Sequence, residues 1–320
     1  MSASPRLVRP ATRYVRNRVF DSAFWDDFPM RPDDIIVSTY PKCGTTWTLR
    51  IVGMMVFGSA DPFAVHNIVP WLDFRAPPPG AMLELAESQT HRRFLKSHLP
   101  FDALPQHEGV KYIHVARDGR DAAMSFFNHK ANYTPEMVER WIELSNGDPR
   151  FGDGDSYDFS PQDPVAHFTR WVDGPEDHQG DPGASYFELE KSFWEARGDP
   201  NVLLVHFNDL KADREGEMRR IAEFLGIELP ADTWSEIVAA AGFEAMKGDA
   251  ARLMPGAEGV WKGGANTFLN KGTNKRWEGV FREDDLARYA AKVKAEFSPS
   301  LAAWCEHGRL VAGDPRALPD

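Results

Sequence analysis

The sequence has few cysteines and no long apolar run. Cys43 and Cys305 are the only cysteines among its 320 residues. Two cysteines are too few for a disulfide framework, and this scarcity favours a reducing, cytoplasmic environment. No stretch approaches the ~20 consecutive apolar residues that a transmembrane helix needs. No Cys/His cluster has the spacing of metal ligands, so no metal site is predicted. These features argue against a secreted disulfide scaffold, a membrane-spanning protein and a zinc-stabilised fold.

The charge balance and composition narrow the class further. A net charge of −11 argues against a nucleic-acid-binding protein, so basic residues that gather in one place gain significance. With 42% hydrophobic and 27% charged residues, the chain has the composition of an ordinary globular protein. We find no internal repeat and no convincing domain boundary. The sequence therefore predicts one large domain, residues 31–320, after a basic arm at residues 1–30.

The arm contains all the basic residues that precede the first acidic residue, Asp21. These are Arg6, Arg9, Arg13, Arg16 and Arg18. Arginine-rich, acid-poor segments also serve as mitochondrial presequences, and a basic arm can touch acidic lipid or the protein's own surface. The pattern favours a plain exposed arm over these alternatives.

Short β-branched or apolar runs alternate with helical patterns along the chain. The predicted strands are Asp34–Thr39, Arg93–His98, Val110–Val115 and Asn201–Phe207. Helical segments are expected after the first and third strands, around residues 167–172, 187–196 and 237–246, and before Gly226. Such alternation predicts an α/β fold with a central, mainly parallel sheet flanked by helices. The Gly-, Asp- and Pro-rich stretch Ser145–Pro164 is interpreted as a long loop of the kind that forms lids.

The stretch Tyr40–Trp47, Tyr-Pro-Lys-Cys-Gly-Thr-Thr-Trp, lies between the first strand and a helix. A strand, a tight Pro/Gly turn and a helix start direct free N–H groups and the positive end of the helix dipole into the turn. Lys42 adds a cation, and Thr45 and Thr46 add hydroxyl donors. This P-loop-like turn predicts a phosphate site. It lacks the Gly-Lys-Ser/Thr of nucleoside triphosphatases, and a merely structural turn is the alternative.

Other charged residues follow neighbouring strands. Because ligands of parallel sheets bind beyond the carboxyl ends of the strands, Lys42, Lys96, His98 and Arg117 are expected around one crevice. In an otherwise acidic protein this is an anion site. Histidine, with a pKa near ~6.5, can accept a proton from an attacking alcohol at neutral pH.

Three segments resemble motifs of the cytosolic-type sulfotransferases. Tyr40–Trp47 resembles their 5′-phosphosulfate loop with Cys43 in place of serine, and Lys96–Pro100, Lys-Ser-His-Leu-Pro, resembles the segment of their catalytic base. Tyr112–Ser125 resembles their 3′-phosphate segment, in which an arginine and a serine bind that group. Phe268–Trp277 is similar to the loop that closes over the 3′-phosphate. The resemblance extends from about Asp34 to Phe281.

The resemblance implies transfer of a sulfuryl group from 3′-phosphoadenosine 5′-phosphosulfate (PAPS) to a hydroxyl or amine, with 3′-phosphoadenosine 5′-phosphate (PAP) as product. It assigns deprotonation of the acceptor to His98, with Lys42 near the bridging oxygen and Lys96 on the sulfuryl oxygens. The implied cofactor-binding residues are Lys42, Cys43, Gly44, Thr45, Thr46, Trp47, Arg117, Ser125, Phe243, Asn270, Lys271 and Gly272. No metal is required on this interpretation.

The chain also departs from the family pattern. Asn270 stands where arginine is usual, Lys275 and Arg276 replace Gly-Asp, and Phe207 replaces a tyrosine. Phe243 either stacks on the adenine or belongs to the core of a helix over residues 237–246. The dimerisation pattern of animal members is not kept after Trp277, so the oligomeric state is open.

The acceptor is predicted to be a small aromatic or lipid-like molecule. Trp71, Phe74 and Phe101 suggest an apolar pocket, with ordinary packing under a loop as the alternative. Two rival functions remain. A nucleotide-binding kinase or ATPase would show Mg²⁺-dependent ATP hydrolysis, and a non-catalytic nucleotide-binding module would bind PAP without turning over any acceptor.

Overall fold

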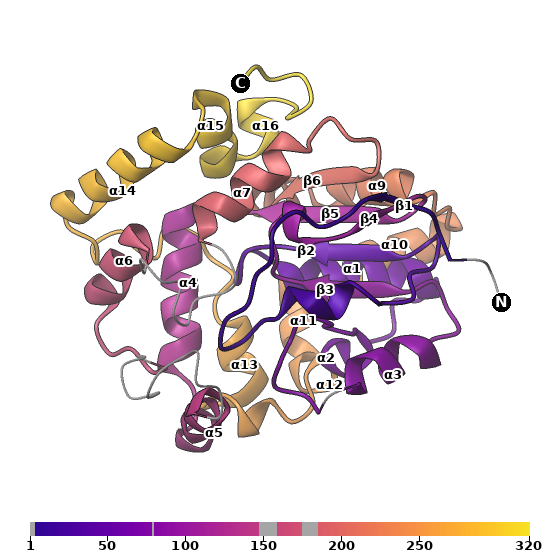
Figure 1. The fold of residues 1–320 in the computed structure, drawn as a ribbon, viewed down its shortest axis with the longest axis horizontal. Helices are drawn as coiled ribbons and strands as arrows, with labels where there is room; N and C mark the ends of the chain where they lie inside the picture. The colour runs from indigo at the N-terminus through magenta and orange to yellow at the C-terminus, as the bar shows by residue number, and fades with distance from the viewer. Residues whose placement is uncertain (1–3, 79, 147–158, 175–184) are drawn as a thin grey trace.

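A four-stranded parallel sheet forms the centre of the computed structural model, which describes residues 4–78, 80–146, 159–174 and 185–320 (Figure 1). The strand order is β3-β2-β5-β6. The strands are β2 (Ile35–Ser38), β3 (Phe94–Ser97), β5 (Lys111–Ala116) and β6 (Val202–His206). The four predicted strands and the α/β class are thus confirmed.

Helices cover both faces of the sheet. Ile35 and Val37 pack with α1 (Thr45–Phe57), α9 (Arg214–Leu225) and α10 (Ala231–Ala240), whereas Ile36 faces the opposite cluster. That second cluster includes α4 (Gly119–Ala131), α7 (Tyr186–Glu195) and α15 (Pro299–His307). Side chains alternate between the faces of a strand, so burial on both sides explains the nearly continuous apolar runs in the sequence.

Shorter elements complete the domain. They are η1 (Ser22–Trp25), α2 (Val65–Ile68), α3 (Ala81–Ser88), η2 (Phe101–Ala103), α5 (Pro135–Asn146), α6 (Pro164–Asp173), α8 (Phe207–Ala212), α11 (Phe243–Gly248), α12 (Ala250–Leu253), η5 (Ala257–Gly259), α13 (Gly264–Leu269), α14 (Glu283–Glu296) and α16 (Arg309–Ala312). Helices α4, α6 and α14 lie side by side (Figure 1). Within the described residues, no helix has the length and apolarity required to cross a bilayer.

The single helix expected over residues 237–246 is wrong, because Gly242 is extended (φ −64°, ψ 148°) and separates α10 from α11. Phe243 therefore begins a new helix. The loop predicted at Ser145–Pro164 is bounded by α5 and α6, and its residues 147–158 lie outside those that the structure describes.

The N-terminal segment is not the exposed arm that its arginines suggested. Strand β1 (Leu7–Arg9) pairs antiparallel with β4 (Gln106–His107). Farther along, Arg18 and Phe20 are each only 2% exposed, and Trp25 is 1% exposed. The Trp25 indole donates to the buried carboxylate of Asp73 (3.1 Å). Aromatic residues among the arginines thus tie the segment to the domain, because each buries a large apolar area.

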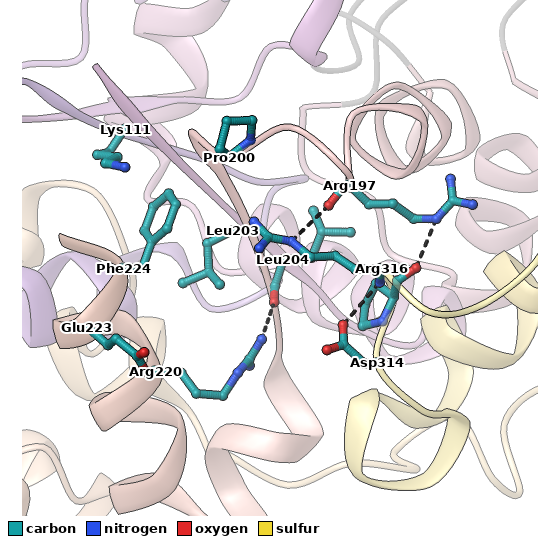
Figure 2. Close-up of a pocket in the computed structure, with 11 residues that line it drawn as sticks. Lys111, Arg197, Pro200, Leu203, Leu204, Arg220, Glu223, Phe224, Asp314 and Arg316 are labelled. Carbon is teal, nitrogen blue, oxygen red and sulfur yellow. Dashed lines mark hydrogen bonds between the residues drawn. The ribbon is translucent and has the colours of Figure 1, made fainter. Parts of the chain in front are cut away.

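A cavity of about 400 Å³ lies where the C-terminal segment meets the edge strand β6 (Figure 2). Its arginines are occupied by main-chain carbonyl groups. Arg316 donates to the oxygens of Arg197 and Val202, and Arg197 donates to that of Pro315. Buried carbonyl groups require such partners. These side chains therefore act as ties between the C-terminal segment and the sheet edge.

Candidate active site

A larger cavity, of about 970 Å³, opens beyond the carboxyl ends of the strands. It is lined by most of the residues that the sequence identified. These are Lys42, Gly44, Thr45, Thr46, Trp47, Trp71, Phe74, Lys96, His98, Arg117, Ser125, Phe243, Asn270 and Gly272. Segments separated by more than two hundred residues thus meet in one crevice, as the parallel-sheet geometry predicted.

Three predicted residues do not line this cavity. The Cys43 side chain is fully buried, and burial raises the pKa of its thiol. Its main-chain N–H donates to the Tyr40 oxygen (3.2 Å), so the residue is not directed into the cavity. Lys271 is exposed and lies outside the cavity lining. Phe101 packs in the core against Tyr112 and Phe193 (centroid distances 5.3 Å each) and does not reach the cavity.

The loop between β2 and α1 forms the floor of the crevice. Its turn uses left-handed backbone at Lys42 (φ 70°) and at Gly44 (φ 110°). A side chain at Gly44 would be strained, and its Cβ would lie 3.1 Å from the Phe207 ring. Gly44 also occupies the N-cap of α1 without a side-chain cap, so the first-turn N–H groups are available to an anion.

Arg117 connects this loop to two other segments. Its guanidinium donates to the main-chain oxygen of Lys42 (3.1 Å) and to that of Thr273 (3.2 Å), and it lies over the Phe207 ring (4.3 Å to the centroid). Asp118, the residue next to Arg117, instead caps α4 and pairs with Arg120. Ser125, two turns along α4, lines the same cavity.

The segment after α13 supplies further cations. Asn270 adopts φ 55°, a conformation that asparagine tolerates better than most residues. Arg276 and Lys211 both line the cavity near Arg117, whereas Lys275 is exposed and pairs with Glu278 (3.6 Å). Of the two cations that replace Gly-Asp, the structure therefore brings only Arg276 to the cavity. Lys211 was missed because nothing in the sequence marks its place at the crevice.

Lys42 and Lys96 lie over aromatic rings in the crevice. The Lys42 Nζ is 3.7 Å from the Phe268 ring centroid, and the Lys96 Nζ is 3.5 Å from that of Trp71. Burial lowers the pKa of both ammonium groups to about 7, and the neighbouring Arg117 and Lys96 lower that of Lys42 further. A site that raises the energy of its own cations in this way favours an anion that restores their charge.

His98 is 5% exposed, and the described residues provide a hydrogen bond to one side of its ring only. Its Nδ1 lies 2.6 Å from the Thr39 carbonyl oxygen, which requires the proton on Nδ1 and leaves Nε2 as an acceptor. Burial, and then the charge of Lys96, lower the pKa of His98 well below 6.5. The imidazole is therefore neutral at physiological pH and can accept a proton.

A buried carboxylate that the sequence analysis missed fixes the wall beside His98. Asp73 accepts hydrogen bonds from the indoles of Trp25 and Trp71 (3.1 Å each), and burial raises its pKa to about 6. The Trp71 ring in turn meets that of His98 edge to face (5.0 Å) and stacks on Phe74 (4.2 Å). The Trp-x-Asp spacing was the only available signal.

Trp47 and Phe243 form the far end of the cavity. The Trp47 indole donates to the Ala241 oxygen (2.8 Å), and its ring contacts Phe207 (5.5 Å). Phe243 is half-buried and faces the cavity at the start of α11, outside the three apolar core clusters of the described chain. Of its two interpretations, placement in a helix core does not hold.

Comparison with known proteins identifies the family to which the chain belongs. The sequence profile of the Sulfotransferase domain matches residues 32–299. The chain belongs to this sulfotransferase family. It is 31% identical to a glycolipid sulfotransferase of Mycobacterium bovis (strain BCG / Pasteur 1173P2), over 92% of this chain and 94% of the relative. It is 29% identical to sulfotransferase 1A1 of Rattus norvegicus, over 83% and 84%. The protein is an enzyme of sulfuryl transfer.

Solved sulfotransferase structures share the fold. A retinol dehydratase in complex with androsterone and the inactive cofactor PAP superimposes with a TM-score of 0.66 at 22% identity, covering 87% of this sulfotransferase and 84% of that chain. Mouse sulfotransferase SULT7A1 complexed with PAP gives a TM-score of 0.65 at 19% identity, covering 90% and 93%. The family assignment and the architecture therefore agree.

Proposed function

We propose that this sulfotransferase transfers the sulfuryl group of PAPS to a hydroxyl group of an aromatic or lipid-like small molecule. One observation carries the proposal. A neutral His98 with an unoccupied Nε2 shares a single cavity with two lysines, a helix-start anion loop and a wall of aromatic side chains. Base, anion site and apolar pocket are the three parts that this reaction needs.

The donor would be held by groups that differ in kind. The first-turn N–H groups of α1, with Thr46 and Lys42, suit the 5′-phosphosulfate. Arg117 and Ser125, with Arg276 and Lys211 nearby, suit the 3′-phosphate, since a guanidinium fork matches phosphate oxygens. Trp47 and Phe243 present ring faces or edges suited to the adenine.

In the proposed step, His98 Nε2 takes the proton of the acceptor hydroxyl as the acceptor oxygen bonds to sulfur. The bond between sulfur and the bridging oxygen breaks, and the electron pair leaves with PAP. Lys42 would offset the negative charge that grows on that oxygen, and Lys96 would steady the sulfuryl oxygens. By analogy with phosphoryl transfer, positioning and charge stabilisation provide the catalysis.

The acceptor side of the cavity is mainly apolar. Trp71, Phe74 and Trp141 form part of its wall, with Phe74 and Trp141 6.0 Å apart. Large aromatic walls with few polar groups typify sites for apolar small molecules. The similarity to glycolipid sulfotransferases supports a lipid-like acceptor.

An acceptor screen with sulfur-labelled PAPS tests this function. We expect transfer to simple phenols or hydroxylated lipids, and PAP binding by calorimetry. Exclusive sulfation of highly charged sugars would contradict the apolar acceptor. PAP binding without turnover of any acceptor would favour the non-catalytic alternative, and Mg²⁺-dependent ATP hydrolysis would favour a kinase or ATPase.

A glycine pair tests the adenine end of the site. Gly272→Ala is expected to weaken PAP binding at least tenfold, because the new Cβ would lie 2.6 Å from the Phe243 ring and displace it. Gly279→Ala is the matched control, since Gly279 also has positive φ (76°) but no atom within 4 Å of its Cβ position. Both variants should lose about 1 kcal/mol of stability to backbone strain. Equal PAP affinities in the two variants would argue against Phe243 as a nucleotide contact.

Arg276→Ala is expected to weaken PAP binding about 10-fold and to reduce its salt dependence, because a charge-assisted contact to phosphate is lost. Lys275→Ala removes the neighbouring cation, which is exposed and paired with Glu278, and should leave affinity nearly unchanged. Calorimetry at two ionic strengths provides the comparison. If Lys275→Ala weakened PAP binding more than Arg276→Ala, Lys275 would be the cation that takes the place of the arginine missing at Asn270.

A further inference from the structure

His129 is a second imidazole in the active-site cavity. It lies on α4 one turn beyond Ser125 and lines the cavity that His98 also lines. Rings surround it. Its centroid is 5.2 Å from those of Tyr133 and Trp261, 5.7 Å from that of Phe268 and 6.2 Å from that of Phe126.

This imidazole lacks a hydrogen-bond partner. Its Nδ1 is buried and unpaired, and His129 forms no hydrogen bond with any residue that the structure describes. Such an arrangement is costly, and buried polar atoms in folded proteins almost always find a partner. His66 also lines the cavity, but it is exposed and can be satisfied by solvent. The other ring nitrogen of His129, Nε2, is not among the buried unpaired atoms and has no hydrogen-bond partner in the described chain, so it is the nitrogen that a molecule bound in the cavity can reach.

The protonation state of His129 defines the partner. Burial, followed by the charges of Lys42 and Lys96, lowers the pKa of His129 well below 6.5. A neutral imidazole has one N–H donor and one acceptor nitrogen. A hydroxyl group can satisfy either, whereas a second anion would find no positive charge on this ring. The chemistry points to an uncharged oxygen group.

We propose that His129 is an acceptor-specificity residue that hydrogen-bonds a second hydroxyl of the acceptor while His98 deprotonates the first. The preferred substrates are then apolar molecules with two hydroxyl groups, such as aromatic diols or dihydroxylated lipids. This inference rests on the proposed function and deepens it. An apolar wall alone discriminates weakly between a hydroxyl and a methyl group, whereas a buried polar group rejects the analogue that leaves it unpaired.

Matched acceptor pairs test the proposal. Catechol, resorcinol and 4,4′-dihydroxybiphenyl place the second hydroxyl at increasing distance, and 2-methylphenol, 3-methylphenol and 4-hydroxy-4′-methylbiphenyl are their methyl partners. The ratio of kcat/KM within each pair is measured for the wild type, His129→Phe, His129→Gln and His91→Phe. His91 packs against Phe57 and Phe94 outside the cavity and serves as a control.

In the wild type we expect at least one diol to be preferred about tenfold beyond the statistical factor of two for its equivalent hydroxyls. His129→Phe should reduce this preference to the statistical factor, His129→Gln should restore part of it, and His91→Phe should leave it unchanged. The proposal would be overturned if the wild-type kcat/KM ratio equalled the statistical factor in every pair. It would also be overturned if His129→Phe lowered kcat/KM equally for the diol and its methyl partner.

Binding of the same acceptors to the PAP complex, by calorimetry, separates this inference from the proposed function. If no acceptor is turned over, the proposed function fails. A diol binding preference that His129→Phe removes would still support the role of His129. Equal binding of diols and methyl partners would overturn it.

Discussion

Replacing His98 with alanine is expected to lower kcat by about 10²–10⁴-fold, the range typical of general acid–base catalysis, while the fold and PAP binding persist. The imidazole is fixed by its hydrogen bond to Thr39 and by its edge-to-face contact with Trp71, so its second nitrogen points away from the Thr39 oxygen. No other described histidine has its Nδ1 held in this way beside Lys96.

His98→Asn distinguishes base from positioning residue. The asparagine amide can still donate to the Thr39 oxygen but cannot accept the proton of the acceptor. If His98 acts as the base, both variants are inactive in single-turnover assays, although circular dichroism and PAP calorimetry match the wild type. Near-normal turnover by folded His98→Asn would reassign His98 to positioning, and His91→Ala controls for loss of a histidine outside the cavity.

The pH profile follows from the same residue. Since burial lowers the pKa of His98 well below 6.5, the base stays unprotonated through neutral pH, and activity is lost only as the pH falls into the acidic range. We therefore expect no acidic limb near pH 6.5 in the dependence of kcat/KM on pH. A limb at the ordinary histidine pKa would mean that the base is solvent-exposed in the working enzyme.

The sequence predicted the parts of this site that local pattern determines. Strand ends were found within a residue because their apolar runs stop where a polar or charged residue enters the crevice, as at Lys96 and His98. The helix start at Gly44 was likewise local. Once a parallel sheet was inferred, the meeting of Lys42, His98 and Arg117 followed from its geometry.

What the sequence could not reveal depends on long-range packing. Phe101 was taken for a pocket residue, but its neighbours Tyr112 and Phe193 come from β5 and α7 and draw it into the core. Asp73 gains its importance only because Trp25 returns from the N-terminal segment to meet it. Burial of Arg18 depends on the same return, which charge patterning cannot register.

Replacing Lys42 with alanine is expected to reduce kcat by about a thousandfold, since loss of one preorganised electrostatic contact costs ~3–4 kcal/mol of barrier. Lys42, like Gly44, has a left-handed backbone conformation in this turn. Its Nζ lies 3.7 Å from the Phe268 ring centroid, and the charges of Arg117 and Lys96 act on it. Lys294→Ala, an exposed change on α14, is the control. If Lys42→Ala raised KM but left kcat unchanged, Lys42 would act in donor binding and not in catalysis.

The charge of Lys42 also determines how nucleotide affinity depends on pH. In the free site the pKa of Lys42 and that of Lys96 are about 7, and bound phosphates raise both, so binding takes up protons above pH 7. PAP affinity should therefore fall as the pH rises above 7. Lys42→Arg keeps a cation at every pH and should make that fall shallower, leaving mainly the part due to Lys96. Calorimetry in buffers of different ionisation enthalpy counts the protons directly. Equal proton uptake by wild type and Lys42→Arg would show that Lys42 is already charged in the free site. That result would contradict the lowered pKa of Lys42.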